Sequence, residues 1–256
     1  MTTTFKTKYG TVDVPTNELY IIEPFKMGSY WDIDTMLKVQ PYINPLRNII
    51  EIGGHVGTST LVYRSFLKDT SKIWVFEPQA RLYEMLSKNI LQNYSAGNTF
   101  PIKGAAFCYT GEMNMNDTPL DGTNTSVSMS IINDAHLQVN YGGISIGSDG
   151  ERIKCFQLDK YTPELDNIGF IHCDAQGSDP FALWGAKDII ARCRPVIIFE
   201  DKALGAGPIF YDHVCKHYPQ YAEQSKFDVI SYCMDELNYT KAFRGFNNSE
   251  NNLLIP

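Results

Sequence analysis

The chain of 256 residues suits one large α/β domain and is short for two. Its residues are 43% hydrophobic and 20% charged, a balance that allows a sizeable packed core and excludes disorder of the whole chain. The formal net charge of -7 is the reverse of the basic footprint of proteins that bind a phosphate backbone. We therefore expect neither nucleic acid nor a membrane surface as a partner.

The six cysteines form no CxxC pair and no Cys/His cluster with zinc-ligand spacing. The first ten residues, MTTTFKTKYG, lack the apolar core of a signal peptide. No apolar stretch approaches the roughly 20 residues that a membrane helix needs. We therefore expect a reducing, cytoplasmic location.

Strand and helix patterns alternate along most of the chain. Residues 1–45 are irregular and should form an N-terminal arm with one short helix at 32–39. In the rest of the chain we expect strands at 48–52, 72–76, 100–107, 152–156, 169–173, 195–199 and 227–232. The helices expected between and after them are at 58–67, 79–92, 179–192 and 210–217. This alternation predicts a single domain, residues 1–256, with a doubly wound, mostly parallel Rossmann-like sheet and helices on both faces.

Residues 117–150 interrupt the alternation with a polar segment rich in Gly, Ser, Asn and Thr. A loop of that length is uncommon in a compact domain and is often functional. We expect this inserted loop to lie near the site of a bound substrate. The aromatic stretch around Tyr30 and Trp31 is expected either to cover the same site or only to pack against the core.

A glycine-rich turn, residues 53–57, follows the first strong strand and opens a helix. Glycines let the backbone turn tightly and approach a ligand. Glu77 ends the next strand, twenty positions after Gly57. An acid at that place can accept hydrogen bonds from both ribose hydroxyls of an adenosine. The pattern therefore predicts a nucleoside-containing cofactor.

The residues around this turn favour S-adenosylmethionine over a dinucleotide. The dinucleotide fingerprint requires glycine where Ile52 stands, and the carboxylate of Glu51 would lie beside a pyrophosphate. The same carboxylate suits the cationic methionine end of S-adenosylmethionine. The ExGxGxG pattern of methyltransferases fits here, with His55 in place of the middle glycine. His55 either contacts the cofactor or only tolerates the turn. The predicted cofactor-binding residues are Glu51, Gly53, Gly54, His55, Gly57, Thr58, Ser59, Glu77, Pro78 and Ala105.

A second group of acids follows two later strands. Asp174 comes after the strand at 169–173, and Glu200 and Asp201 come after the strand at 195–199. Because three carboxylates repel one another, a shared proton or a cation such as Mg²⁺ would be needed if they converge. We predict that Asp174 is catalytic, either as a general base or as a ligand of Mg²⁺ together with Glu200 and Asp201. Alternatively, Glu200 and Asp201 are solvated acids at a strand end.

Three segments together resemble the FkbM family of methyltransferases: NIIEIGGHVGTST from position 48, WVFEP from position 74 and IHCDAQGSDPFALWGAKDIIARCRPVIIFE from position 171. The matching positions are Phe76-Glu77-Pro78, Asp174, Gly177, Gly185-Ala186, Arg194-Pro195 and Glu200. The departures are Glu51 for the family's Asp, His55 for Asn, His172 for Lys, Gln176 for Glu and Asp179 for a second Glu.

The resemblance implies an S-adenosylmethionine-dependent O-methyltransferase that acts on a hydroxyl of a small molecule or of a sugar or glycan. Related sugar O-methyltransferases use Mg²⁺, for which Asp174, Glu200 and Asp201 would be the ligands. Two other functions stay open at this point, a nicotinamide-dependent oxidoreductase and a non-catalytic Rossmann-like binding protein. The departures at His172 and Gln176 keep the non-catalytic binding protein open as an alternative. A nucleic-acid methyltransferase is disfavoured by the acidic charge.

Overall fold

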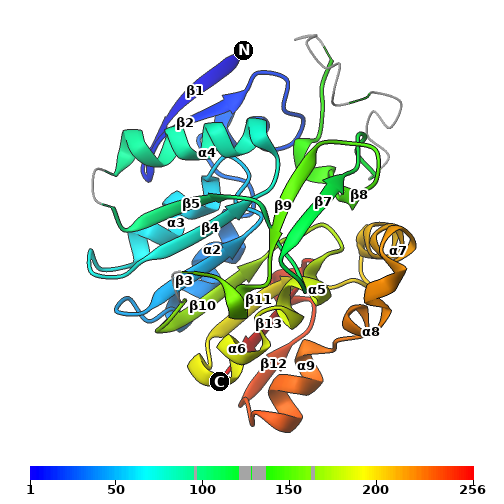
Figure 1. The fold of residues 1–256 in the computed structure, drawn as a ribbon. Helices are drawn as coiled ribbons and strands as arrows, with labels where there is room; N and C mark the ends of the chain where they lie inside the picture. Colours follow the sequence, from blue (N-terminus) through cyan, green and yellow to red (C-terminus); the bar gives the residue numbers. More distant parts are fainter. Residues whose placement is uncertain (95–96, 121–127, 129–136, 163–164) are drawn as a thin grey trace.

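The computed structural model describes residues 1–94, 97–120, 128, 137–162 and 165–256, and a seven-stranded sheet forms its centre (Figure 1). The strand order is β12-β13-β11-β10-β3-β4-β5. The strands are β3 (Asn48–Ile52), β4 (Ile73–Glu77), β5 (Thr99–Lys103), β10 (Ile168–Cys173), β11 (Val196–Glu200), β12 (Lys241–Phe243) and β13 (Asn251–Ile255). Of these, β13 runs antiparallel to both neighbours, and the others are mutually parallel. The predicted mostly parallel α/β sheet is confirmed.

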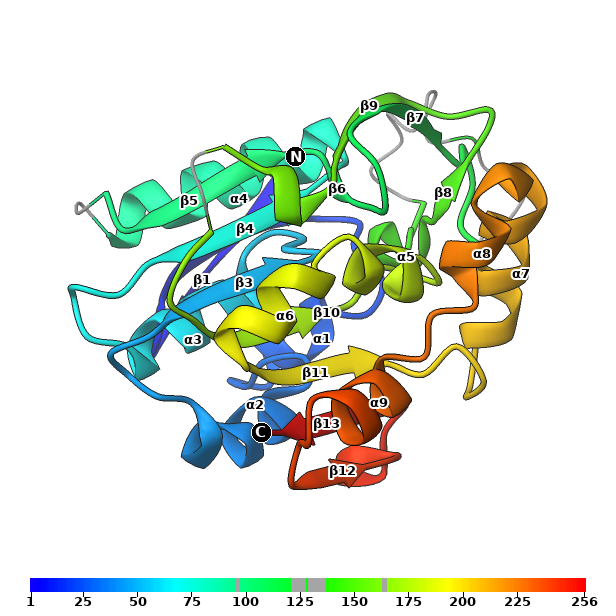
Figure 2. The ribbon, with the colours of Figure 1, turned by 60° about the horizontal axis from the view of Figure 1, so that its bottom comes forward.

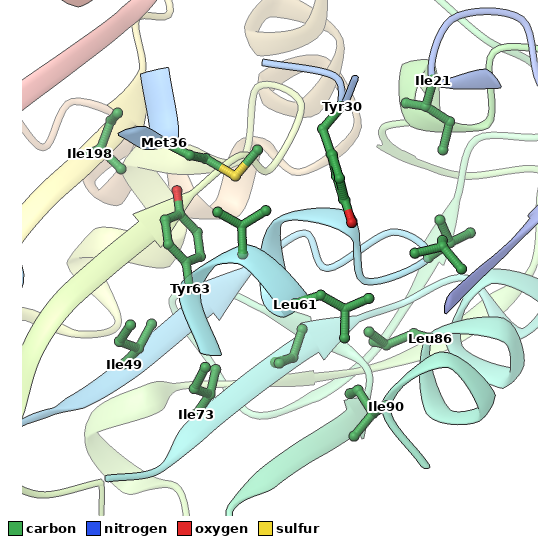
Figure 3. Close-up of a cluster of buried hydrophobic side chains, with 14 of the residues drawn as sticks. Ile21, Tyr30, Met36, Ile49, Leu61, Tyr63, Ile73, Leu86, Ile90 and Ile198 are labelled. Carbon is green, nitrogen blue, oxygen red and sulfur yellow. The ribbon is translucent and has the colours of Figure 1, made fainter. Parts of the chain in front are cut away.

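Apolar side chains cover both faces of this sheet. Its central strands NIIEI and IWVFE are buried at every position, as expected of parallel strands with two covered faces. One face packs against α2 (Ile33–Val39), α3 (Thr58–Phe66) and α4 (Ala80–Asn93). Figure 3 shows part of that cluster, including Met36 of α2, Tyr63 of α3 and Leu86 of α4. The other face packs against α5 (Asp179–Trp184), α6 (Lys187–Cys193) and α9 (Val229–Ser231).

The register of the parallel strands aligns four carboxyl ends in one row. Ile52 of β3 pairs with Phe76 of β4 on one side and with Cys173 of β10 on the other, and Cys173 pairs with Phe199 of β11. The chain leaves β3 toward β4 and leaves β10 toward β11, so the direction of winding reverses between β3 and β10. Ligands of open α/β sheets bind outside the carboxyl ends at such a reversal.

A second, four-stranded sheet has the order β6-β9-β7-β8. Its strands are β6 (Ala105–Ala106), β7 (Gly111–Met115), β8 (Ile146–Gly147) and β9 (Arg152–Phe156). The strand predicted at 100–107 is divided between β5 and β6 at Gly104, whose φ of 153° lets the chain change sheets. The sheet packs against α7 (Gly207–His217), which lies beside it in Figure 2. The predicted loop 117–150 is described only in part, and its end contributes β8.

The N-terminal arm differs from the expectation. Its first residues form an antiparallel hairpin of β1 (Thr2–Thr7) and β2 (Gly10–Pro15), followed by α1 (Ile22–Lys26). Asn89 of α4 holds the hairpin in place: its side chain accepts a hydrogen bond from Asp13 N at 2.9 Å. It also donates to Asp13 O at 2.9 Å and to Val56 O at 2.8 Å. These hydrogen bonds thus hold the hairpin against α4, one of the helices that cover this sheet.

The C-terminal prediction was also wrong. The strand expected at 227–232 is replaced by α9 and a π-helical turn, Tyr232–Glu236, because the carboxylate of Asp228 accepts hydrogen bonds from Ile230 N and Ser231 N and caps a helix. The helix expected at 179–192 breaks into α5 and α6. A further short helix is α8 (Ala222–Ser225). Within the described part of the chain, no helix is both long and apolar enough to cross a bilayer.

Replacing Asn89 by Ala tests the docking of the hairpin. We expect the free energy of unfolding to fall by about 3 kcal/mol, because three buried backbone groups lose their partner. Chemical denaturation in urea measures this. Leu91→Ala, at a side chain of the same helix that is 76% exposed, is the control and should cost less than about 1 kcal/mol. Equal losses for the two variants would contradict the assignment.

Candidate functional site

A cavity of about 670 Å³ lies at the aligned carboxyl ends of β3, β4, β10 and β11. Its volume lies within the range of small-molecule and cofactor sites. The core strands contribute Gly53, Glu77, Asp174 and Glu200 to its wall. The remaining walls come from distant segments of the chain, namely residues 18–36, 140–146, 206–210 and 249–251.

The glycine turn allows the two central strands to meet at the cavity floor. Gly53 has a φ of 86°, and a Cβ there would lie 2.0 Å from the carbonyl oxygen of Asp174. No other residue fits this place. Gly54 and Gly57 do not line the cavity; a Cβ on either would collide with side chains of Val75 or Leu86 behind it. Of the predicted glycines, therefore, Gly53 alone is at the cavity surface.

Glu51 is placed differently from the prediction. Its carboxylate is fully buried beneath the cavity and does not line it. It accepts hydrogen bonds from the hydroxyls of Ser59 and, at 2.7 Å, Thr60, in the first turn of α3. The Nδ1 atom of His172 lies 3.9 Å away. Glu51 thus fixes the start of α3 from beneath the cavity, and its contact with the methionine end of a cofactor stays a prediction.

Glu77 meets the cavity from the end of β4. One carboxylate oxygen accepts a hydrogen bond from His55 N at 2.8 Å, and the other accepts one from Gln79 N at 2.9 Å. Burial raises the pKa of Glu77 to about 8. A carboxylate oxygen has room for a second donor. Glu77 is therefore placed to bind vicinal hydroxyls.

His55 offers unused hydrogen-bonding capacity at the same wall. Its backbone is left-handed, with a φ of 48°, and neither ring nitrogen has a hydrogen-bond partner within the described residues. Burial lowers the pKa of His55 to about 4, so the ring is neutral at pH 7. Its Nε2 lies 3.8 Å from a carboxylate oxygen of Glu18, whose pKa burial raises to about 7. A polar ligand would satisfy these atoms.

Asp174 and Glu200 are joined by an amide. Gln176, in a left-handed backbone conformation with a φ of 47°, directs Nε2 to within 2.6 Å of Asp174 Oδ1 and 3.4 Å of Glu200 Oε2. Burial, and then the charge of Asp174, raise the pKa of Glu200 well above its usual range. The departure at position 176 thus has a structural role: a neutral donor lies between two acids that repel each other.

The predicted Mg²⁺ site is not assembled. The carboxylate of Asp201 turns away from the cavity and accepts hydrogen bonds from Asn252 Nδ2 and Ala203 N, both at 2.9 Å. Asp201 follows the last residue of β11, and these two hydrogen bonds hold its carboxylate apart from the cavity that Glu200 lines. The part of the chain that is described contains no group of three or more His, Cys, Asp or Glu residues able to hold a metal.

The other predicted residues lie where expected. The cavity wall includes Thr58, Ser59, Pro78 and Ala105. Sequence reasoning did not identify Glu18, Gln79, Ser178 and Glu250, which also line it. Gln79 directly follows a motif residue and was within reach of prediction. Ser178 lies four positions after Asp174 in the same motif segment and was also within reach. Glu18 and Glu250 lack a sequence signal, because tertiary packing alone brings them to the strand ends.

A model of the methyltransferase FkbM domain matches residues 51–239. Among solved structures, the methyltransferase FkbM from Methylobacillus flagellatus KT is 14% identical, with a TM-score of 0.50 over 82% of this chain and 43% of that one. A putative caffeoyl-CoA O-methyltransferase from Staphylococcus aureus is 12% identical, with a TM-score of 0.43 over 88% and 81% of the two chains. The SAH-bound methyltransferase PaMTH1 from Podospora anserina is 14% identical, with a TM-score of 0.42 over 86% and 75%.

The present chain spans less than half the length of the Methylobacillus protein. At this identity the likeness shows the fold alone, a Rossmann-like α/β fold. No curated protein sequence matches the chain.

Because burial raises the pKa of Glu77, we predict that the free energy of unfolding depends on pH. In the unfolded chain Glu77 loses its proton near its ordinary pKa of 4.5, but in the folded protein it keeps the proton up to about pH 8. The folded state therefore binds more protons in this window, and the free energy of unfolding should fall as pH rises from 4.5 to 8. Denaturation in urea across this window measures the slope.

Glu77→Gln should flatten that slope, whereas Glu84→Gln on the exposed side of α4 should leave it unchanged. A slope of the opposite sign, or one that Glu77→Gln does not alter, would show that the carboxyl of Glu77 ionises freely in the folded protein.

Proposed function

Because the chain belongs to the FkbM methyltransferase family, we propose that it transfers a methyl group from S-adenosylmethionine to a hydroxyl group of a small molecule or sugar. The observation that carries this proposal is the row of Glu77, Gly53, Asp174 and Glu200 along one cavity. Residues that would bind a nucleoside and a residue that would remove a proton follow neighbouring strands there.

The residues present fit the cofactor. Glu77 would accept hydrogen bonds from the ribose hydroxyls, and His55 would supply its unpaired ring nitrogens. Gly53 keeps the cavity floor free of a side chain, and Thr58 and Ser59 offer donors at the start of α3. Pro78 and Ala105 would line the apolar part. When bound, S-adenosylmethionine supplies a methyl group activated by its sulfonium.

Asp174 is the proposed general base. Gln176 holds Oδ1 by its hydrogen bond and thereby fixes the orientation of the carboxylate. The other oxygen, Oδ2, would accept the proton of the substrate hydroxyl as that oxygen becomes the nucleophile. Burial and the charge of Asp174 raise the pKa of Glu200 well above its usual range, so a protonated Glu200 would be able to donate to the same substrate. No step requires a metal, and positioning supplies much of the rate acceleration.

Two exposed aromatic side chains at the cavity, Tyr20 and Trp31, support a sugar as acceptor. Their ring centroids lie 5.8 Å apart with a tilt of 43°. Flat rings of this kind suit the apolar face of a pyranose. The free state of all six cysteines supports a reducing location for this reaction, as proposed from the sequence.

Calorimetric titration of the protein with S-adenosylhomocysteine tests the cofactor assignment. We expect binding, and we expect Glu77→Ala to weaken it at least about 100-fold, because two hydrogen bonds to a charged group are lost. Glu84→Ala is the matched control, and NAD⁺ is the control ligand. Binding of NAD⁺ in place of S-adenosylhomocysteine would overturn the proposal in favour of an oxidoreductase. Binding of neither would favour the non-catalytic alternative.

The same titration should depend on pH. Below the Glu77 pKa of about 8 the cofactor must displace a proton before its ribose hydroxyls can donate to the carboxylate. We therefore expect affinity for S-adenosylhomocysteine to rise with pH by up to about tenfold per unit and to level off near pH 8. Affinity that falls with rising pH would place the ribose elsewhere. Glu77→Gln should abolish the dependence.

A further inference from the structure

The cavity carries a strong excess of acid. Six carboxylates line it, and among the described residues of its wall there is no lysine or arginine. These acids are Glu18, Asp32, Glu77, Asp174, Glu200 and Glu250. The positions outside the described ranges, 95–96, 121–127, 129–136 and 163–164, contain no lysine or arginine in the sequence either. The chain therefore offers no strong cation to an anionic ligand in this cavity.

The acids concentrate around Asp174, on the side away from Glu77. The charges of Asp174, Asp179 and Glu250 all act on Glu200, and that of Asp174 also acts on Asp32. Gln176 supplies the donor between Asp174 and Glu200, but it is neutral. The charge of His172, which also lines the cavity, acts on Asp174 and Asp32. The carboxylates outnumber this single partner, and an excess of carboxylates held this close attracts any cation that can reach them.

Two further observations indicate that a ligand belongs there. Ser178 lines the cavity with only 1% of its surface exposed, and its hydroxyl has no hydrogen-bond partner within the described residues. Trp31, which lines the same cavity, is 50% exposed, lies beside Tyr20 and is followed in the chain by Asp32. An aromatic face next to a carboxylate is a favourable environment for an ammonium group.

We propose that the methyl acceptor carries a protonated amine, which binds between Trp31, Asp32 and the Glu200–Glu250 side of the cavity. The inference rests on the proposed function, since it describes the second substrate of the same reaction. The methyl donor balances only part of the six acids, because its ammonium and sulfonium groups are offset by its own carboxylate to a net charge of +1, and its nucleoside is assigned to the Glu77 side. Acceptors that bear phosphate or carboxylate, such as nucleotides and acyl thioesters of coenzyme A, are disfavoured by the same charges.

Three matched probes test the charge of the acceptor: glucosamine, glucose and glucuronate. Each is titrated into the full-length protein saturated with S-adenosylhomocysteine, at a pH below the pKa of the probe's amine, and binding is followed by ligand-observed NMR. We expect glucosamine to bind at least about tenfold more tightly than glucose, and glucuronate not to bind. Equal binding of glucosamine and glucose, preferred binding of glucuronate, or binding of none of the three would overturn the inference.

Two variants locate the amine. Glu250→Gln and Asp32→Asn should each reduce the preference for glucosamine over glucose, whereas Glu84→Gln, remote from the cavity, should retain it. A preference that survives both cavity variants would overturn the placement. The affinity for S-adenosylhomocysteine, measured in the same samples, separates the two proposals. If it is retained while the probes fail, the acceptor inference alone is wrong, and if it is absent, the cofactor assignment fails first.

Discussion

The close approach of β3 and β10 at their carboxyl ends determines the rest of the site. Asp174 N donates to Ile52 O at 3.0 Å, and Gly53 lies so close to the carbonyl of Asp174 that no side chain fits between them. Because β4 and β11 pair in register with these two strands, Glu77 and Glu200 reach the same edge as Asp174. The acid proposed to bind the nucleoside and the candidate base therefore share one cavity through backbone pairing alone.

That arrangement has an electrostatic cost, since it buries several acids and thereby disfavours their charged forms. Burial raises the pKa of Glu77 to about 8 and the pKa of Asp179 to about 7. The fold tolerates the acids partly by protonation and partly by neutral donors such as the Gln176 amide and the backbone N–H groups of His55 and Gln79. Sites that are unsatisfied in this way favour ligands that bring donors or positive charge.

The central strands and the acids that follow them were predictable from the sequence, because apolar runs such as NIIEI mark buried parallel strands and the carboxyl ends of such strands form the binding edge. The side-chain directions were not. Glu51 and Asp201 each stand one residue from a cavity position. The alternation of side chains along β3 turns Glu51 away from the cavity, and hydrogen bonds to Ala203 N and Asn252 hold Asp201 away from it. The N-terminal hairpin and the segment at 227–232 were missed because their patterns are short and tertiary contacts decide them.

The wall facing the core strands depends on contacts between segments far apart in the sequence. Glu18 forms a bridge with Val139, and the Tyr141 hydroxyl donates to Asn17 at 3.2 Å. Gln79 next to the motif acid donates to Tyr141 O at 2.9 Å, so this wall is fastened to the cofactor side. The glycine and acid motifs in the sequence identify the half of the cavity that the sheet builds. The half that we propose selects the acceptor is built from the arm and the late loops, so its acidic and aromatic character becomes visible only in three dimensions.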